Sequence, residues 1–251
     1  MMRRLFSGAP GGAGPAPPPG TCLYAIGDVH GRTDLLRALH TLIAEDAAQR
    51  SAPRKVIVYL GDLVDRGRDS RGVIELLLAQ PMAGFECVHL RGNHEDTLLN
   101  FLDDISAGPG WFAFGGEETV ASYGVRRPLP SDDEAELLRV QREFRDALPG
   151  AHRKFLEALK LCHAEGDYLC VHAGVKPGVP LAQQDGHDLM WIREEFLNSK
   201  EDFGKVVVHG HTITREPELR RNRIGIDTGA FMTNRLTCLA AESDKRIILQ
   251  T

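Results

Sequence analysis

The feature that most constrains this chain is a pattern that occurs five times, in which an apolar run ends in glycine and polar side chains. The segments are 26–31, 60–67, 90–95, 171–174 and 208–212. A short apolar run closed by turn residues is typical of a buried strand. Each run is followed by a carboxylate, an amide or an imidazole. The pattern therefore predicts strand ends that converge on one polar site.

Strand and helix patterns alternate over the first hundred residues. We expect strands at 23–26, 55–60 and 85–90, and helices at 33–48, 69–80 and 94–105. The first helix is indicated by Leu35, Leu39 and Ile43, which recur on one face. The run at 55–60 is continuously apolar, as in a strand that is buried on both sides. This alternation predicts a largely parallel sheet.

The middle of the chain, at about 103–165, is predicted to be a mostly helical insertion. It begins with an irregular segment at 107–124, which is rich in glycine and aromatic residues, and continues with helices at 132–147 and 151–162. Strand patterns then return at 168–171, 205–208, 224–227, 236–240 and 246–249, with a helix at 188–197. Because short turns join the last three strands, we expect antiparallel ribbons there.

Composition limits the class of protein. A chain of 251 residues, 42% of them hydrophobic, suffices for one α/β domain, which we place at 21–251. Residues 1–20 are rich in glycine and proline and are predicted to be a disordered tail. No run is long enough to span a membrane or to form a signal peptide, so we expect a cytoplasmic protein. The net charge of −5 gives no reason to expect nucleic-acid binding.

The polar residues at the strand ends have the chemistry of a metal site. The candidates are Asp28, His30, Asp62, Asn93, His172 and His211. The first two are close enough in sequence to hold one cation, and Asp62 has two oxygens that can bridge two. Carboxylate and imidazole suit manganese, iron or zinc. Two such ions roughly 3.5–4 Å apart can polarise a phosphoryl group and ionise a water.

Other residues of the same segments suit catalysis on a phosphate. His94 follows Asn93 directly and could protonate a leaving oxygen. Asp65 could hold the His94 ring, and Arg66 and Arg91 could each bind two phosphate oxygens. Taken alone, Asn93 and Glu95 could equally be a helix cap. All five segments together favour the metal site.

These segments together resemble the signature motifs of the PPP-type metallophosphatases, which belong to the calcineurin-like metallophosphoesterases. The motifs are GDVHG at 27–31, GDLVDRG at 61–67, RGNHE at 91–95, HAG at 172–174 and GHT at 210–212. The resemblance covers about 23–250 and extends to Trp111, to 122–124, to 188–193 and to 226–230. Within this group the chain is most similar to bacterial and phage serine/threonine protein phosphatases.

The resemblance implies a four-layer α/β/β/α sandwich, in which two mixed sheets carry the metals at the carboxyl ends of their strands. It implies two divalent ions, usually manganese, with iron or zinc as possible substitutes. By position, Asp28 and His30 would bind the first ion, Asp62 would bridge, and Asn93, His172 and His211 would complete the second. His94 and Asp65 would form an acid dyad. Arg66, Arg91 and Arg193 would hold the phosphate.

The function implied is hydrolysis of phosphoserine or phosphothreonine. The substrate would be a phosphorylated protein or a small phosphoester. A metal-bridging hydroxide would attack phosphorus directly, with His94 as general acid. The alternative is a hydrolase of dinucleoside polyphosphates of the diadenosine tetraphosphate (Ap4A) type, or a broad small-molecule phosphatase. Asp65 and Glu95 favour the first reading, because the dinucleoside branch tends to differ at both positions. A non-catalytic scaffold would have no use for the dyad. The oligomeric state stays open, and a monomer is compatible with the sequence.

Overall fold

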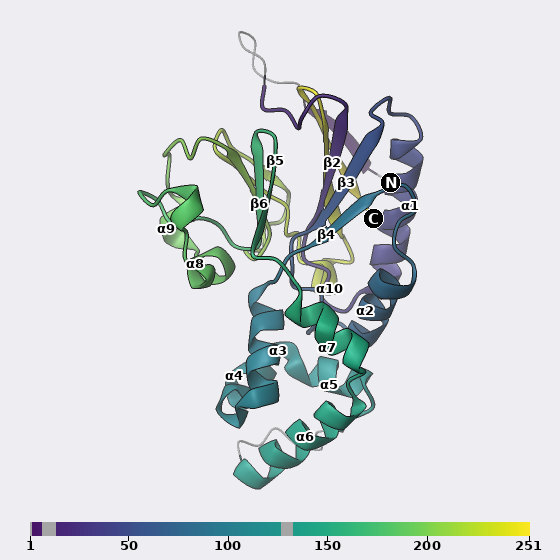
Figure 1. The fold of residues 1–251 in the computed structure, drawn as a ribbon, viewed down its shortest axis with the longest axis vertical. Coiled ribbons are helices and arrows are strands. Elements are labelled where there is room, and N and C mark those ends of the chain that lie inside the picture. Colours follow the sequence, from purple (N-terminus) through teal and green to yellow (C-terminus); the bar gives the residue numbers. More distant parts are fainter. Residues whose placement is uncertain (1, 7–13, 127–132) are drawn as a thin grey trace.

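The computed structural model describes residues 2–6, 14–126 and 133–251, and it contains two β-sheets packed face to face (Figure 1). The first sheet has six strands in the order β1-β11-β10-β2-β3-β4. Their bounds are β1 Met2–Phe6, β2 Thr21–Ile26, β3 Arg54–Tyr59, β4 Glu86–His89, β10 Thr237–Glu242 and β11 Lys245–Gln250. Strands β2, β3 and β4 are parallel, whereas β10 runs antiparallel to β2 and β11 antiparallel to both β10 and β1.

The second sheet has five strands in the order β5-β6-β7-β9-β8. Their bounds are β5 Cys162–Glu165, β6 Tyr168–Val171, β7 Val206–His209, β8 Glu218–Leu219 and β9 Arg223–Gly225. Strands β6, β7 and β9 are parallel, and β5 and β8 pair antiparallel at the two edges. Both sheets are therefore mixed, as expected.

Alternation along the strands produces three apolar layers. In β2, Tyr24 packs into the core shared with the helices, whereas Leu23 packs between the two sheets. Val58 of β3 and Val208 of β7 also lie in the layer between the sheets. The outer face of the second sheet forms a third cluster with Phe196. Strand β3 is buried on both sides because it lies inside this sandwich.

Helices cover the two outer faces, which completes the predicted α/β/β/α arrangement. Helices α1 (Thr33–Ala47) and α2 (Ser70–Ala79) contribute side chains to the core on the outer face of the first sheet. Helices α8 (Gly186–Trp191) and α9 (Glu194–Leu197) contribute Leu189 and Phe196 to the cluster on the second. Helix α10 (Ala230–Thr233) lies near the ends of the strands (Figure 1).

The part of the chain that connects β4 of the first sheet to β5 of the second is helical. It contains α3 (Asn93–Asp103), α4 (Gly108–Trp111), α5 (Glu117–Ser122), α6 (Glu134–Ala147) and α7 (Gly150–Glu157), and it projects from the sandwich in Figure 1. The prediction of an irregular segment at 107–124 is wrong, because α4 and α5 are joined by a π-helical turn at Phe112–Gly116. The aromatic residues of this segment supply the apolar contacts that short helices need. The helix predicted at 151–162 ends at Glu157, and β5 follows it.

The N-terminal prediction needs a correction. Strand β1 pairs with the edge strand β11, and the Ala16 backbone amide donates to the Asp167 carboxylate at 3.0 Å. Asp167 N donates in return to Ala16 O at 2.9 Å. Strand pairing at the edge of the first sheet and the two Ala16–Asp167 hydrogen bonds therefore order described residues of this segment, although its composition is that of a disordered one. Residues 1 and 7–13 lie outside the described part of the chain.

The C-terminal strands also differ from the expectation. Of the last three predicted strands, β10 and β11 pair with each other as an antiparallel ribbon, and they join the first sheet. Strand β9 pairs parallel with β7 in the second sheet, and its antiparallel partner is the short β8.

Within the ranges that the structure describes, no helix has the length and apolarity needed to cross a bilayer.

Candidate metal centre

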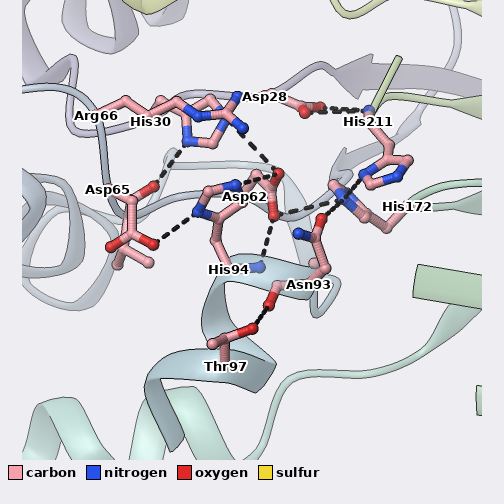
Figure 2. A network of polar contacts seen from close by, with 12 residues as sticks. Asp28, His30, Asp62, Asp65, Arg66, Asn93, His94, Thr97, His172 and His211 are labelled. Carbon is pink, nitrogen blue, oxygen red and sulfur yellow. Dashed lines mark hydrogen bonds and ion pairs between the residues drawn. The ribbon is translucent and has the colours of Figure 1, made fainter. Parts of the chain in front are cut away.

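The six candidate ligands lie together at the carboxyl ends of strands from both sheets (Figure 2). Asp28 and His30 follow β2, Asp62 follows β3, Asn93 begins α3 after β4, His172 follows β6, and His211 follows β7. All six side chains are buried. Because ligands in α/β proteins bind at the carboxyl ends of parallel strands, this placement fits the usual location of a site.

Two glycines let the loops approach each other closely. A Cβ atom at Gly92 would collide with the Asp62 carboxylate, and one at Gly210 would collide with the Asp28 carboxylate. The absent side chains leave room for both acids. The His94 amide donates to Asp62 Oδ1 at 3.1 Å, and the His211 amide donates to Asp28 Oδ2 at 3.0 Å.

Several site residues have a left-handed backbone, which is uncommon for residues other than glycine. They are His30, Asp62, Asp65, Arg66 and His211. Such strain is retained where the surrounding structure fixes it, and it clusters at functional sites. The backbone thus supports a functional reading of these loops independently of the side-chain chemistry.

The first group of potential ligands is built around His30 and Asp62. The Nδ1 atom of His30 lies 2.8 Å from the Val64 carbonyl, which can only accept, so Nδ1 carries the proton. Nε2 therefore carries the lone pair, which lies 3.0 Å from Arg66 Nη1 and 3.6 Å from Asp62 Oδ2. The ligand atoms of His30, Asp62 and His94 lie within 4.8 Å of one another. This spacing would allow them to surround one cation.

The second group places several hydrogen-bond acceptors close to one another. His172 Nδ1 donates to the Leu60 carbonyl at 2.9 Å, which leaves a lone pair on Nε2. That Nε2 lies 3.0 Å from Asn93 Oδ1, 3.4 Å from Asp62 Oδ1 and 3.2 Å from His211 Nδ1. His211 Nε2 is buried and has no hydrogen-bond partner among the described residues. Lone pairs that converge in this way fit a cation, because a bound metal would satisfy them.

A third buried carboxylate, which the sequence reasoning assigned no role, belongs to the same region. Burial and the nearby charges of Asp227 and Asp62 raise the pKa of Asp28 well above its ordinary value. Burial likewise raises the pKa of Asp227, whose Oδ2 has no partner within the described ranges. Burial also raises the pKa of Asp62, but His172 and His94 outweigh this and hold it well below its usual range. Bound cations would offset the repulsion among these acids.

His94 and Asp65 form the predicted pair. His94 Nδ1 lies 2.6 Å from Asp65 Oδ2, and Trp111 Nε1 donates to the same oxygen at 2.8 Å. Thr119 donates to the other Asp65 oxygen at 2.6 Å. Burial lowers the pKa of His94, but Asp62 and the hydrogen bond to Asp65 outweigh it and leave the pKa raised. The ring is thus held in place, and its proton-bearing form is favoured.

The three candidate arginines are placed differently. Arg66 Nη1 lies 3.0 Å from His30 Nε2 and its guanidinium stacks over Phe231, so it borders the site. Arg193 Nη1 lies 3.4 Å from the His211 carbonyl, at the opposite side. Arg91 instead donates to the Glu157 carbonyl at 3.0 Å and lies 3.7 Å from Asp96. Its guanidinium is therefore held by α3 and α7 in this structure.

Glu95 has a structural task that its position in the sequence only partly indicated. Its carboxylate is buried and accepts hydrogen bonds from the amides of Gly92, Asp62, Leu63 and Val64 at 2.7–3.2 Å. The bond to Gly92 is that of a helix cap, whereas the other three tie α3 to the loop after β3. Asn93 is the first residue of α3 and not its cap.

Comparison with known proteins gives consistent results. A family model described as calcineurin-like phosphoesterase matches residues 23–231. A Bacillus mycoides protein named bis(5'-nucleosyl)-tetraphosphatase PrpE [asymmetrical] is 27% identical over 225 residues, which cover 85% of this chain and 88% of that protein.

Two solved structures have a similar fold. One is titled a putative diadenosine tetraphosphatase, with 20% identity, a TM-score of 0.58 and coverage of 95% of this chain and 97% of the other. The second is titled a cold-active protein tyrosine phosphatase, with 17% identity, a TM-score of 0.63 and coverage of 94% and 81%. At these identities the likeness concerns the fold alone.

Proposed function

Because the chain belongs to the calcineurin-like phosphoesterase family, we propose that it is a dinuclear-metal hydrolase that cleaves dinucleoside polyphosphates. The observation that carries hydrolysis is the convergence of imidazole, amide and carboxylate acceptor atoms on both sides of Asp62. The substrate class is supported by the name of the Bacillus mycoides relative, which matches over most of both chains.

The proposed ligand assignment is supported by the histidines that lie beside each oxygen of Asp62. Asp28, His30 and Asp62 would hold one ion, and Asp62, Asn93, His172 and His211 would hold the other. When bound, two divalent ions polarise a phosphoryl group and lower the pKa of water. Asp62 is the shared ligand because its two oxygens face different histidines, His30 and His172.

The protein's own contribution to bond cleavage is a positioned proton. Asp65 engages His94 Nδ1, so the proton on Nε2 is the one that can pass to the leaving oxygen as the P–O bond breaks. Arg66 borders the same space and can pair with phosphoryl oxygens through two N–H groups. Arg193 is a candidate for the other side, and Arg91 would need to leave Glu157 to take part.

A second candidate is a phosphomonoesterase acting on phosphoserine or phosphothreonine. The His94–Asp65 pair favours it, because a serine alkoxide needs a proton far more than a phosphate leaving group does. The two candidates therefore differ in how strongly turnover depends on His94.

A substrate panel tests the proposal. With Mn²⁺ added, kcat/KM for diadenosine tetraphosphate should exceed that for a phosphoserine peptide by about tenfold or more, and chelation should abolish both activities. The panel should be repeated with Fe²⁺, Zn²⁺ and Mg²⁺. A higher kcat/KM for the peptide would reject the dinucleoside assignment and leave the phosphomonoesterase.

A further inference from the structure

A small cavity beside His94 has no role in the chemistry described so far. It has a volume of about 130 Å³ and is lined by residues of α8 and of the helical insertion. Its walls include Phe114 and Trp191 as well as His94 and Thr97. A pocket for a complete drug-sized ligand has roughly 300–1,000 Å³. This cavity therefore suits one ring system and not a peptide or a complete nucleotide.

Phe114 lines this cavity and belongs to the π-helical turn. Its side chain is 62% exposed, whereas Trp111 is only 1% exposed. The next residue, Gly115, has a φ of 105°, and its carbonyl accepts a hydrogen bond from the Arg66 amide at 3.0 Å. A π-helical turn within a helix frequently marks a functional site. The turn thus fixes an exposed aromatic ring relative to the arginine that borders the metal centre.

Trp191 also lines the cavity, and two neighbouring rings contact it. The ring stacks on His187 with centroids 6.0 Å apart and an angle of 16°. It meets the candidate ligand His211 edge-on, at 6.4 Å and 76°. Rigid aromatic walls bind planar rings well, because little side-chain entropy is lost when a ring stacks on them.

The position of the cavity relates it to one part of the substrate. His94 forms part of its wall, and a general acid must lie beside the leaving oxygen. Building on the proposed function, we propose that this cavity, which we call the aromatic cleft, binds a nucleobase attached to the leaving group. Phe114 and Trp191 would then determine specificity, because they would favour binding of nucleotides over phosphoesters that lack an aromatic ring.

A binding experiment tests this cleft independently of turnover. The chain has two tryptophans, and Trp111 is buried, so AMP should quench the fluorescence of Trp191. The experiment compares AMP with ribose 5-phosphate, which lacks only the base, in the Mn²⁺-loaded protein. The variants are Phe114→Ala, Trp191→Leu, and, as a control, Leu138→Ala, which removes an exposed apolar side chain of α6 outside the cleft.

We expect Phe114→Ala to weaken AMP binding by about 5- to 150-fold, while the affinity for ribose 5-phosphate stays within twofold. Leu138→Ala should bind AMP as the unmodified protein does, and Trp191→Leu should lose the quenching. The KM for diadenosine tetraphosphate should rise in Phe114→Ala. Unchanged AMP affinity, or an equal loss for both ligands, would overturn the cleft assignment. Failure of the unmodified protein to cleave diadenosine tetraphosphate would instead overturn the proposed function, because the AMP titration decides the cleft alone.

Discussion

At the scale of single residues, the site depends on which nitrogen of each histidine carries a proton. The carbonyls of Val64 and Leu60 accept from Nδ1 of His30 and His172, so both rings present Nε2 to the centre. His94 also turns Nδ1 toward an acceptor, but this acceptor is the Asp65 carboxylate, which helps to raise the pKa of His94. The same residue type thus serves as ligand or as acid according to what its second nitrogen contacts.

His94→Asn tests the acid assignment. The variant should lower kcat on phosphoserine by about 10²- to 10⁴-fold, because the leaving alkoxide then lacks a proton donor. Its metal content, measured by elemental analysis, should match that of the unmodified protein. Full turnover would show that His94 is not the acid, and a lost ion would make it a ligand together with His30 and Asp62.

Trp111→Phe tests whether the support of Asp65 matters for turnover. It removes one donor to Asp65 and keeps an aromatic ring in the core. We expect kcat to fall about tenfold and the free energy of unfolding to fall by about 1 kcal/mol. Tyr123→Phe is the control, since it removes a buried hydrogen bond to His152 in the same insertion. Equal kcat values in the two variants would argue against a positioning role for Trp111.

The residue patterns predicted part of this site. Asp28, His30 and Asp62 could be selected because each follows an apolar run. Asp227 also follows a strand, but the single acid in that loop gave no sign of its contact with the other carboxylates. Arg91 lies at the motif position expected for a phosphate-binding arginine, but its guanidinium donates to the Glu157 carbonyl of α7 instead. Tertiary contacts determine where these two side chains lie, and the spacing of residues along the sequence does not reveal such contacts.

At the scale of elements, Glu95 joins helix α3 to the loop after β3 and so positions Asp62. The buried carboxylate accepts four backbone hydrogen bonds, one from Gly92 and three from residues 62–64. The link fixes two strand ends of the first sheet relative to each other. It also explains how Asp62 keeps a left-handed backbone.

Glu95→Gln should weaken this link. An amide offers one acceptor oxygen, and its NH₂ group would face backbone amides that also donate, so we expect a loss of about 2–3 kcal/mol in unfolding free energy. Urea denaturation measures this loss. Glu86→Gln is the matched control, because Glu86 is an exposed carboxylate that pairs with Arg54, and its urea midpoint should not change. Equal midpoints in the two variants would contradict the structural role.

Long elements were predictable and short ones were not. Helix α1 has an apolar periodicity over four turns and strand β3 has a continuous apolar run, and the structure places both within a few residues of the prediction. Helices α4 and α5 are too short for a periodic signal and are stabilised by aromatic packing, for example between Phe101 and Trp111. Strand β1 depends on pairing with β11, and that partner lies at the other end of the sequence.

At the scale of the whole molecule, the sandwich brings two sheets to one shared edge. Ligands from β2, β3 and the start of α3 meet ligands from β6 and β7, so neither sheet could form the site alone. The prediction of two stacked mixed sheets is confirmed, and it came from family resemblance. Periodicity alone indicated a parallel sheet and could not divide the strands between two sheets.

Removal of metal should affect the stability of the whole fold. Three buried carboxylates lie close together, and cations that bind only the folded state stabilise it by mass action. Treatment with EDTA should therefore lower the Tm by about 5–15 °C, and added Mn²⁺ should restore it. The measurement is a thermal melt followed by circular dichroism. A Tm that EDTA does not change would show that no ion stabilises this centre.

The central claim is that Asp62 is shared by two metal ions, and counting ions per chain tests it most directly. Elemental analysis of the protein equilibrated with Mn²⁺ should find two ions per chain. His30→Ala should lose one ion, because it removes a ligand from one side only. Asp62→Asn should lose both, because both sides depend on this carboxylate. An Asp62→Asn protein that is folded and still holds two ions would contradict the account.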